Sequence, residues 1–321
     1  MKHLIRGIAA LLLALVASVG AAQNYPNRPI RVVVPFGTGS GGDILARIIA
    51  DRLTVGVGQP FIVDNRPGAS GTIGAQLAFS SAPDGYTLVL SSTGMAITAS
   101  AYQSLKYDTA AFTSVTVITH SPLGFAANPS FTAKTVPEFI AYAKANPGKV
   151  SYGSLGIATS HHVTGEKLKM DAGIDMVHVP YKGSGAAHTD LIGGHIQVMF
   201  DNIVALMPHF KSGRLHPLAV SSLKRHRLLP DVPSLAEAGV KGFEAVTMIG
   251  FAAPPGTPKD VIARLNAEVV KVLAIPEVRQ RLLETGFDVI GDSPEDADRY
   301  FKAEIARWGV VIKAANIRLT D

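Results

Sequence analysis

The chain has 321 residues, of which 47% are hydrophobic and 17% are charged, with a formal net charge of +5. It is too apolar for a disordered protein and long enough for two α/β domains of about 100–200 residues each. The lack of cysteine excludes disulfides, thiolate chemistry and iron–sulfur clusters, and the absence of a Lys/Arg run among aromatic residues disfavours nucleic-acid binding.

Residues 1–22 have the pattern of a secretory signal peptide. Lys2 and Arg6 form a basic start, Ile8–Val19 is apolar, and the small residues Gly20 and Ala22 precede the expected cleavage site. The apolar run of about 12 residues is shorter than the roughly 20 that span a bilayer, which disfavours a membrane anchor. We expect an exported, periplasmic protein.

The first third of the mature chain alternates between strands and helices. Strands are predicted at Ile30–Val34, Phe61–Val63 and Thr87–Leu90. The first strand is followed by the glycine-rich turn Gly37–Gly42, and Asp43 is the expected N-cap of a helix over Ile44–Leu53. The third strand leads into the polar loop Ser91–Gly94. This alternation predicts a parallel sheet with helices on both faces.

The middle of the chain repeats this order. Strands are predicted at Val150–Tyr152, Met176–Val179 and Ile196–Phe200, and helices at Pro137–Ala145, from about Ser160, and after Gly185. Towards the C-terminus a strand over Phe251–Pro255 precedes three helices. These are Pro258–Leu273 with Thr257 as cap, Pro276–Glu284, and a helix from Pro294 with Ser293 as cap.

The C-terminal helices carry apolar stripes that need a sheet to cover, and the first domain is the economical candidate. We therefore expect a discontinuous domain 1 over residues 23–121 plus 250–321, and domain 2 over residues 122–249. Two strands would cross between the domains, near 118–125 and 246–252.

The turn Gly37–Gly42 fits G-x-G-x-x-G, and Asp64 stands where a dinucleotide-binding fold places its ribose-binding acid. Pro35-Phe36 ahead of the first glycine, the negative charge of Asp43, and export away from NAD all disfavour a dinucleotide. Free N–H groups at a glycine-rich helix start still attract an anion, and a carboxylate suits them as well as a phosphate.

Catalytic and metal-binding patterns are weak. The chain has no G-x-S-x-G, H-E-x-x-H or G-K-[ST] motif, and its middle histidines match no ligand spacing, which favours solvated or capping roles for them. Glu166 has no neighbouring nucleophile in the sequence. Tyr181 and Lys182 either clamp a carboxylate or lie in solvent, and Asp201 either contacts a ligand at a strand end or caps the next helix.

From about Tyr25 to Trp308 the sequence resembles the extracytoplasmic solute receptors of the tripartite tricarboxylate transporter family, the Bug receptors. The segments that carry the resemblance are Tyr25-Pro26, Pro29–Phe36, Asp43–Arg47, Val63–Ala69, Ala82–Leu88, Val177–Ser184, Gln197–Asn202, Leu229–Ser234 and Ala253–Lys259. In combination and in this order they are highly specific.

The resemblance implies an α/β, two-domain periplasmic binding protein of the type II (Venus flytrap) class, each domain a mostly parallel sheet flanked by helices. It implies a cleft that holds a carboxylate through amides, hydroxyls and waters. The family's two binding loops fall on Pro35–Asp43 and Ser154–His162, with Ser40 at a usual glycine position and His161 at a usual small hydroxyl position. If His161 faces the cleft, we expect a larger or aromatic acid.

The expected site has substrate-binding residues and no catalytic or metal-binding residues. The expected set is Phe36, Gly37, Thr38, Gly39, Ser40, Gly41, Asp43, Ser92, Thr93, Gly94, Ser154, Thr159, Ser160, His161, Tyr181, Lys182, Gly183 and Asp201.

We expect a monomeric receptor, without cofactor, that delivers a small organic carboxylate to the permease subunits of a tripartite tricarboxylate-type transporter. A membrane sensor is compatible as a further partner. The alternative is a secreted α/β enzyme, a hydrolase or a dinucleotide-dependent enzyme, that uses the turn 37–42. Dicarboxylates, tricarboxylates, aromatic acids and amino acids all fit the expected loops.

Overall fold

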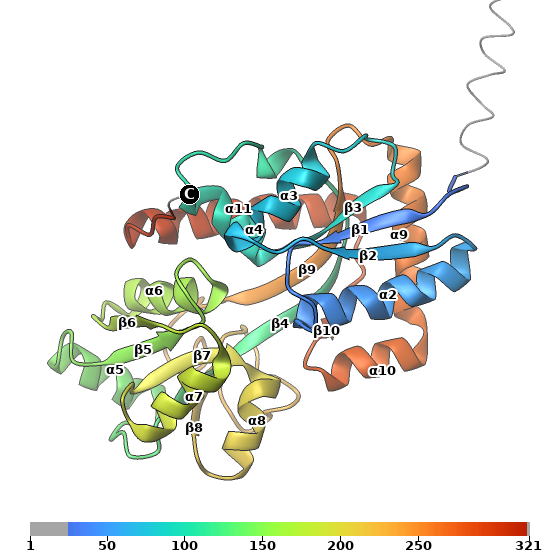
Figure 1. The fold of residues 1–321 in the computed structure, drawn as a ribbon. Helices are drawn as coiled ribbons and strands as arrows, with labels where there is room; N and C mark the ends of the chain where they lie inside the picture. The colour runs from blue at the N-terminus through green and yellow to red at the C-terminus, as the bar shows by residue number, and fades with distance from the viewer. Residues whose placement is uncertain (1–24, 320–321) are drawn as a thin grey trace, which may run out of the picture.

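The computed structural model describes residues 25–319, so the predicted signal peptide lies outside the described residues. The strands form one mixed ten-stranded sheet in the order β2-β1-β3-β9-β4-β7-β5-β6, with β8 and β10 also paired to β4. Figure 1 shows two lobes, with β4 and β9 running between them.

The first lobe is built on a parallel group of three strands. These are β1 (Ile30–Val34), β2 (Phe61–Asn65) and β3 (Thr87–Ser92). β1 lies between the other two and pairs in parallel with both, as predicted. β9 (Val246–Ala253) is antiparallel to β3 and to β4. A strand was expected over residues 251–255; the observed strand β9 begins five residues earlier and ends two residues earlier.

The second lobe has a parallel group of its own. The group consists of β5 (Ser151–Ser154), β6 (Val177–Pro180) and β7 (Val198–Asn202), while β8 (His216–Val220) lies in the same lobe and pairs with β4. β5 pairs in parallel with β6 and β7. The long strand β4 (Thr113–Ala127) is antiparallel to β7, β8, β9 and the short β10 (Asp288–Val289). The centre of the sheet is therefore antiparallel, because the chain crosses there between lobes.

Helices cover the sheet in both lobes. In the first lobe they are α2 (Gly41–Val57), α3 (Thr72–Phe79), α4 (Thr93–Ala101), α9 (Lys259–Ala274), α10 (Pro276–Glu284) and α11 (Pro294–Ala314). In the second they are α5 (Val136–Ala145), α6 (Ser160–Ala172), α7 (Ser184–Gly193) and α8 (Ile203–Lys211). Short 3₁₀ turns lie at η2 (Ala69–Gly71) and η3 (Thr109–Ala111).

The C-terminal helices pack on elements of the first lobe. α9 packs on α2 and β4, and α11 packs on α4 and β4 (Figure 1). Trp308 of α11 is buried. The Ser293 side chain caps α11 by accepting the backbone N–H of Asp296 at 3.1 Å. The predicted Thr257 cap of α9 is wrong: the N-cap is Pro258, and the Thr257 hydroxyl instead donates to the carbonyl of Pro254.

Within residues 25–319, none of the helices combines the length and apolarity that crossing a membrane requires.

Candidate functional site

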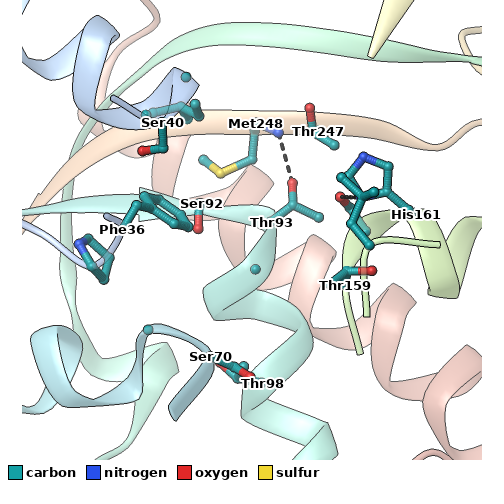
Figure 2. A pocket seen from close by; sticks show the side chains of 18 of the residues that line it. Phe36, Ser40, Ser70, Ser92, Thr93, Thr98, Thr159, His161, Thr247 and Met248 are labelled. Atoms are coloured by element: carbon teal, nitrogen blue, oxygen red, sulfur yellow. Dashed lines mark hydrogen bonds between the residues drawn. The ribbon is translucent and has the colours of Figure 1, made fainter. Parts of the chain in front are cut away.

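A cavity of about 580 Å³ lies where the two lobes face each other (Figure 2). The first lobe contributes the β1–α2 loop, the turn around η2, the start of α4 and part of β9. The second lobe contributes residues 155, 157–161 and 202. Residues far apart in the sequence therefore form one site, because the crossing strands bring the loops of both lobes to the same cleft.

Four helices begin at this cavity. Their N-cap residues all line it: Ser40 for α2, Ser92 for α4, Thr159 for α6 and Asn202 for α8. Each helix start carries unpaired backbone N–H groups and the positive end of a helix dipole, equivalent to about half a charge. The arrangement favours an anion in the cavity.

Side-chain charge is nearly absent from the same walls. Among the lining residues in the described part of the chain there is no Lys, Arg, Asp or Glu, and His161 is the one titratable side chain. Residues 25–319 also hold no group of three or more His, Asp or Glu side chains placed to bind a metal ion. Selectivity for an anion must therefore come mainly from backbone dipoles, hydroxyl groups and His161.

Apolar side chains form much of the remaining wall. They come from both lobes and from the long connections: Phe36, Leu123, Leu155, Ile157, Met248, Ile249 and Phe287. Burying apolar surface against such side chains stabilises a ligand by roughly 25 cal/mol per Å². The cavity can thus accommodate a molecule with an anionic end and a hydrophobic body.

Ten of the predicted site residues line the cavity. They are Phe36, Gly37, Ser40, Gly41, Ser92, Thr93, Gly94, Thr159, Ser160 and His161. Residues 91–94 are nevertheless not the loop that was predicted, because β3 continues through Ser92 and α4 begins at Thr93. The hydroxyl oxygen of Thr93 accepts the backbone N–H of Met248 at 2.8 Å (Figure 2).

Asp43 does not line the cavity and is not the N-cap of α2. Ser40 holds that position and accepts the backbone N–H of Asp43 at 3.2 Å. The buried carboxylate of Asp43 accepts the N–H of Gly39 at 2.8 Å and the side-chain amide of Asn65 at 2.9 Å. Burial alone would raise the pKa of Asp43, but these bonds and Arg47 hold it below its usual value. Asp43 therefore stabilises the β1–α2 loop through these hydrogen bonds without lining the cavity.

Thr38 and Gly39 form the exposed tip of that loop, and neither lines the cavity. Gly39 has a φ of 81°, in the left-handed region that favours glycine. Its backbone N–H points back to Asp43 rather than to the cleft.

Three predicted residues after β6 lie away from the cavity. The Tyr181 hydroxyl donates to Asp190 at 2.7 Å, Lys182 is exposed, and Gly183 is the N-cap position of α7. β6 and β2 are the two ends of the strand order, yet of these two strands only β2 is followed by described residues that reach the cavity, so an edge position by itself does not account for the difference. Of the two roles considered for Lys182, the structure favours a solvent-exposed side chain.

Ser154 and Asp201 lie beneath the cavity wall. The Ser154 hydroxyl is 2.6 Å from Nε2 of His178. Asp201 is buried inside β7, and its carboxylate lies 2.9 Å from Nε2 of His188 and 3.2 Å from Nε2 of His161. Asp201 is thus neither a lining residue nor a helix cap, since Asn202 takes the N-cap position of α8.

The sequence reasoning missed the turn around η2. Four successive residues, Gly68 to Gly71, have φ values of 123°, 45°, 54° and 91°, and three of them line the cavity. Left-handed conformations at Ala69 and Ser70 are sparsely populated and often occur at functional sites. The signal was available, because Pro67-Gly68-Ala69 is part of the family resemblance. Thr247, Met248 and Ile249 were also missed, although β9 was expected to cross.

The geometry does not favour the enzyme alternative. Asp64, the expected ribose-binding acid, pairs with Arg31 and Arg66 and does not line the cavity. Ser160, His161 and Asp201 have the residue types of a hydrolytic triad. However, Ser160 is adjacent to His161, and its hydroxyl is 3.5 Å from the ring Nδ1, at the limit of a hydrogen bond.

Comparisons with known proteins also indicate a solute receptor. A family model described as "Tripartite tricarboxylate transporter family receptor" matches residues 45–317. A UPF0065 protein encoded in the tcbD–tcbE intergenic region of Pseudomonas sp. strain P51 is 36% identical over 312 residues, which cover 96% of this chain and 93% of that protein.

Two solved structures resemble this chain in both fold and sequence. Rpa4515 of Rhodopseudomonas palustris, solved with adipate, is 37% identical with a TM-score of 0.79, covering 92% of this chain and 99% of its own. MatC of the same organism, solved with bound malate, is 31% identical with a TM-score of 0.76, covering 90% and 100%.

These matches confirm the predicted fold class and the absence of an enzymatic role. The chain belongs to the tripartite tricarboxylate transporter receptor family, whose members are two-domain periplasmic solute-binding proteins.

Proposed function

We propose that this receptor binds a small organic carboxylate in the cavity between its lobes. The observation that carries the proposal is the convergence of four helix N-caps on a cavity wall to which residues 25–319 contribute no Lys or Arg. Adipate and malate in two related structures support the same ligand class. Backbone N–H groups and hydroxyls would hold the carboxylate, directly or through water.

The binding residues in this proposal are the lining residues from both lobes. Ser40, Gly41, Thr93 and Gly94 would bind from the first lobe, and Thr159, Ser160 and His161 from the second. Because the ligand touches both lobes, it would bind the closed arrangement more tightly and shift the population towards it. We propose domains over residues 23–121 plus 250–321 and over residues 122–249, with β4 and β9 as the connection.

We also propose that the receptor delivers the acid to permease subunits of a tripartite tricarboxylate-type transporter, and the family membership supports this partner. In this proposal residues 1–22 direct export and are removed, and the mature receptor acts as a monomer in the periplasm. A membrane sensor that reads the loaded receptor is a second proposed partner.

The test is a thermal-shift screen of residues 23–321 against dicarboxylates, tricarboxylates, aromatic acids and neutral sugars, with calorimetry on the hits. A ligand at a hundredfold excess over Kd should stabilise the folded protein by about 2.7 kcal/mol. NMR of the recovered ligand should show no chemical change. Stabilisation by sugars and by no acid would overturn the carboxylate assignment, and conversion of the ligand would restore the enzyme alternative.

A further inference from the structure

The short loop between β5 and α6 forms most of the second lobe's part of the cavity wall. Leu155 and residues 157–161 line the cavity. Within this loop Gly156 has a φ of 124° and Ala158 a φ of 57°. A left-handed alanine is sparsely populated, and it persists only where the surrounding structure holds it. A neighbouring group must therefore hold Ala158 in this conformation.

The side chain of His162 holds the backbone of Ala158. His162 is the third residue of α6, is 6% exposed and is not among the residues that line the cavity. Its Nδ1 accepts the backbone N–H of Ala158 at 3.1 Å in the interior of the lobe. The N–H of Ala158 is thus directed to a buried side chain and not to the cavity.

This hydrogen bond requires an unprotonated Nδ1. Burial is the main cause that lowers the pKa of His162 to about 3, and His178 and Lys169 add to the effect. The ring is therefore neutral at pH 7, with its one proton on Nε2 and a lone pair on Nδ1 that accepts the N–H of Ala158.

A second histidine supports both the ring of His162 and the same loop. The rings of His162 and His178 are parallel to within 7°, with 3.7 Å between centroids. His178 comes from β6, and its Nε2 lies 2.6 Å from the hydroxyl of Ser154. That hydroxyl oxygen accepts the N–H of Gly156 at 3.2 Å. The stacked pair therefore reaches the loop twice, at Ala158 directly and at Gly156 through Ser154.

These bonds determine which N–H groups the loop offers to a ligand. The N–H groups of Gly156 and Ala158 already have acceptors within the lobe. The first N–H groups of a helix have none within the helix, and Ser160 and His161 begin α6 at the cavity wall. A loop that is fixed in this way also needs little ordering when a ligand arrives, which favours tight binding.

We propose that His162 is a positioning residue for ligand binding: its Nδ1 fixes the turn at Ala158 and so presents the start of α6 to the acid, without touching the acid itself. The inference rests on the proposed function, because it assumes that an acid binds in the cavity. The stack on His178 stabilises the ring, but the acceptor nitrogen is the feature that positions the loop.

Three substitutions separate the acceptor of His162 from its ring. His162→Asn loses the ring but keeps an acceptor oxygen one bond from Cγ, where Nδ1 stands. His162→Phe keeps a ring against His178 and loses the acceptor. His162→Leu has nearly the shape of the Asn variant without the acceptor, so it takes the place of His162→Phe should that variant fail to fold. His120→Phe is the matched control, because His120 packs on Tyr300 outside the cavity and its Nε2 has no hydrogen-bond partner among the described residues.

Two measurements follow the loop and the ligand separately. Amide hydrogen exchange by NMR without ligand reports the bond from Ala158 to His162, and calorimetry at pH 7 with succinate, adipate, citrate and benzoate reports affinity. In His162→Phe we expect the Ala158 amide to exchange at least tenfold faster and the best acid to bind at least tenfold more weakly. His162→Asn should stay within threefold of the wild type in both, although the loss of the stacked ring makes it the less stable variant in urea. The control should match the wild type in both.

Weak binding by His162→Asn as well as His162→Phe would assign the effect to the ring and refute the role of the acceptor. Wild-type affinity in His162→Phe, or affinities that follow the urea midpoints, would show that His162 only stabilises the lobe. An Ala158 amide that exchanges at the wild-type rate in His162→Phe would overturn the proposal whether or not an acid binds. A wild type that binds none of the four acids would count against the proposed function, and the exchange rates would still decide whether His162 fixes the loop.

Discussion

The hydroxyl oxygen of Thr93 accepts the backbone N–H of Met248 at 2.8 Å, which ties the first turn of α4 to the crossing strand β9 (Figure 2). Both residues line the cavity and both are buried. Since the Thr93 oxygen is an acceptor in this bond, its own proton is available for donation into the cavity. One side chain therefore links the helix start, the crossing strand and the proposed ligand.

Thr93→Val should remove both interactions without changing the shape of the side chain. We expect a loss of about 1–3 kcal/mol in unfolding free energy, because a buried N–H loses its partner, and a roughly tenfold weaker affinity for the best acid. Urea unfolding and calorimetry measure the two effects. Thr93→Ser keeps the hydroxyl and is the control; a Ser variant as impaired as the Val variant would point to packing rather than to the hydrogen bond.

Gly42 is closely packed in the glycine-rich turn and Gly37 is not, so variants at these two positions test whether packing matters there. A Cβ on Gly42 would lie 2.8 Å from Cδ2 of Phe36 and 3.1 Å from Cδ2 of Leu90, whereas a Cβ on Gly37 would meet nothing within 4 Å. We expect Gly42→Ala to displace Phe36 from the cavity wall, with a loss of about 1–3 kcal/mol in stability and weaker acid binding. Gly37→Ala should stay within about 0.5 kcal/mol of the wild type in a thermal melt. Identical behaviour of the two variants would contradict this account.

Ser40 and Asp43 stabilise the same turn by different means. Ser40→Ala removes an N-cap and should cost about 1 kcal/mol in unfolding free energy. Asp43→Asn should cost more, about 2–3 kcal/mol, because Gly39 and Asn65 donate to different carboxylate oxygens and one of these becomes an NH2 group, which cannot accept. Chemical denaturation ranks the two variants. The opposite ranking would mean that Asp43 contributes less to the turn than its burial indicates.

Ser40 and Asp43 also show where local sequence reasoning reaches its limit. Both residue types are good N-caps and they stand three positions apart, so the pattern alone does not decide where α2 begins. The glycines at 41 and 42 disfavour a helix by intrinsic propensity, but packing of Gly42 against Phe36 and Leu90 overrides that preference. The parallel strands were predictable because runs such as Ile30–Val34 are β-branched and buried at every position but Arg31.

The sequence predicted which residues follow each strand, but not which of these loops meet at the cavity. The loops after β1 and β5 and the direct junction of β3 with α4 reach the cavity, and their residues were identified from the strand–loop–helix order. Lys182 also follows a strand, but the loop after β6 does not reach the cavity, whereas the loop after β2 does, and the strand–loop–helix order does not distinguish the two. The contact of His161 with Asp201 joins α6 to β7, and a pairing across that separation leaves no local pattern.

The stability of the protein should fall in acid because of buried histidines. The ring of His120 packs against that of Tyr300 in a tilted arrangement with 4.8 Å between centroids, and its Nε2 has no hydrogen-bond partner among the described residues. Burial lowers the pKa of His120 to about 4, with Asp288 opposing and Arg307 adding to the effect. Burial and the neighbouring His178 and Lys169 lower the pKa of His162 to about 3.

The direction of the change in unfolding free energy with pH follows from the number of protons that each state binds. Between the ordinary histidine pKa of 6.5 and a folded pKa of about 4, the unfolded chain binds a proton that the folded protein does not, so unfolding free energy decreases as pH falls. His120→Phe keeps the stacking on Tyr300 and removes this proton. Between pH 7 and pH 5 we expect the wild type to lose about 1–2 kcal/mol more than His120→Phe in urea unfolding. Parallel pH profiles for the two proteins would show that His120 is protonated in the folded state, and would contradict the stated effect of its burial.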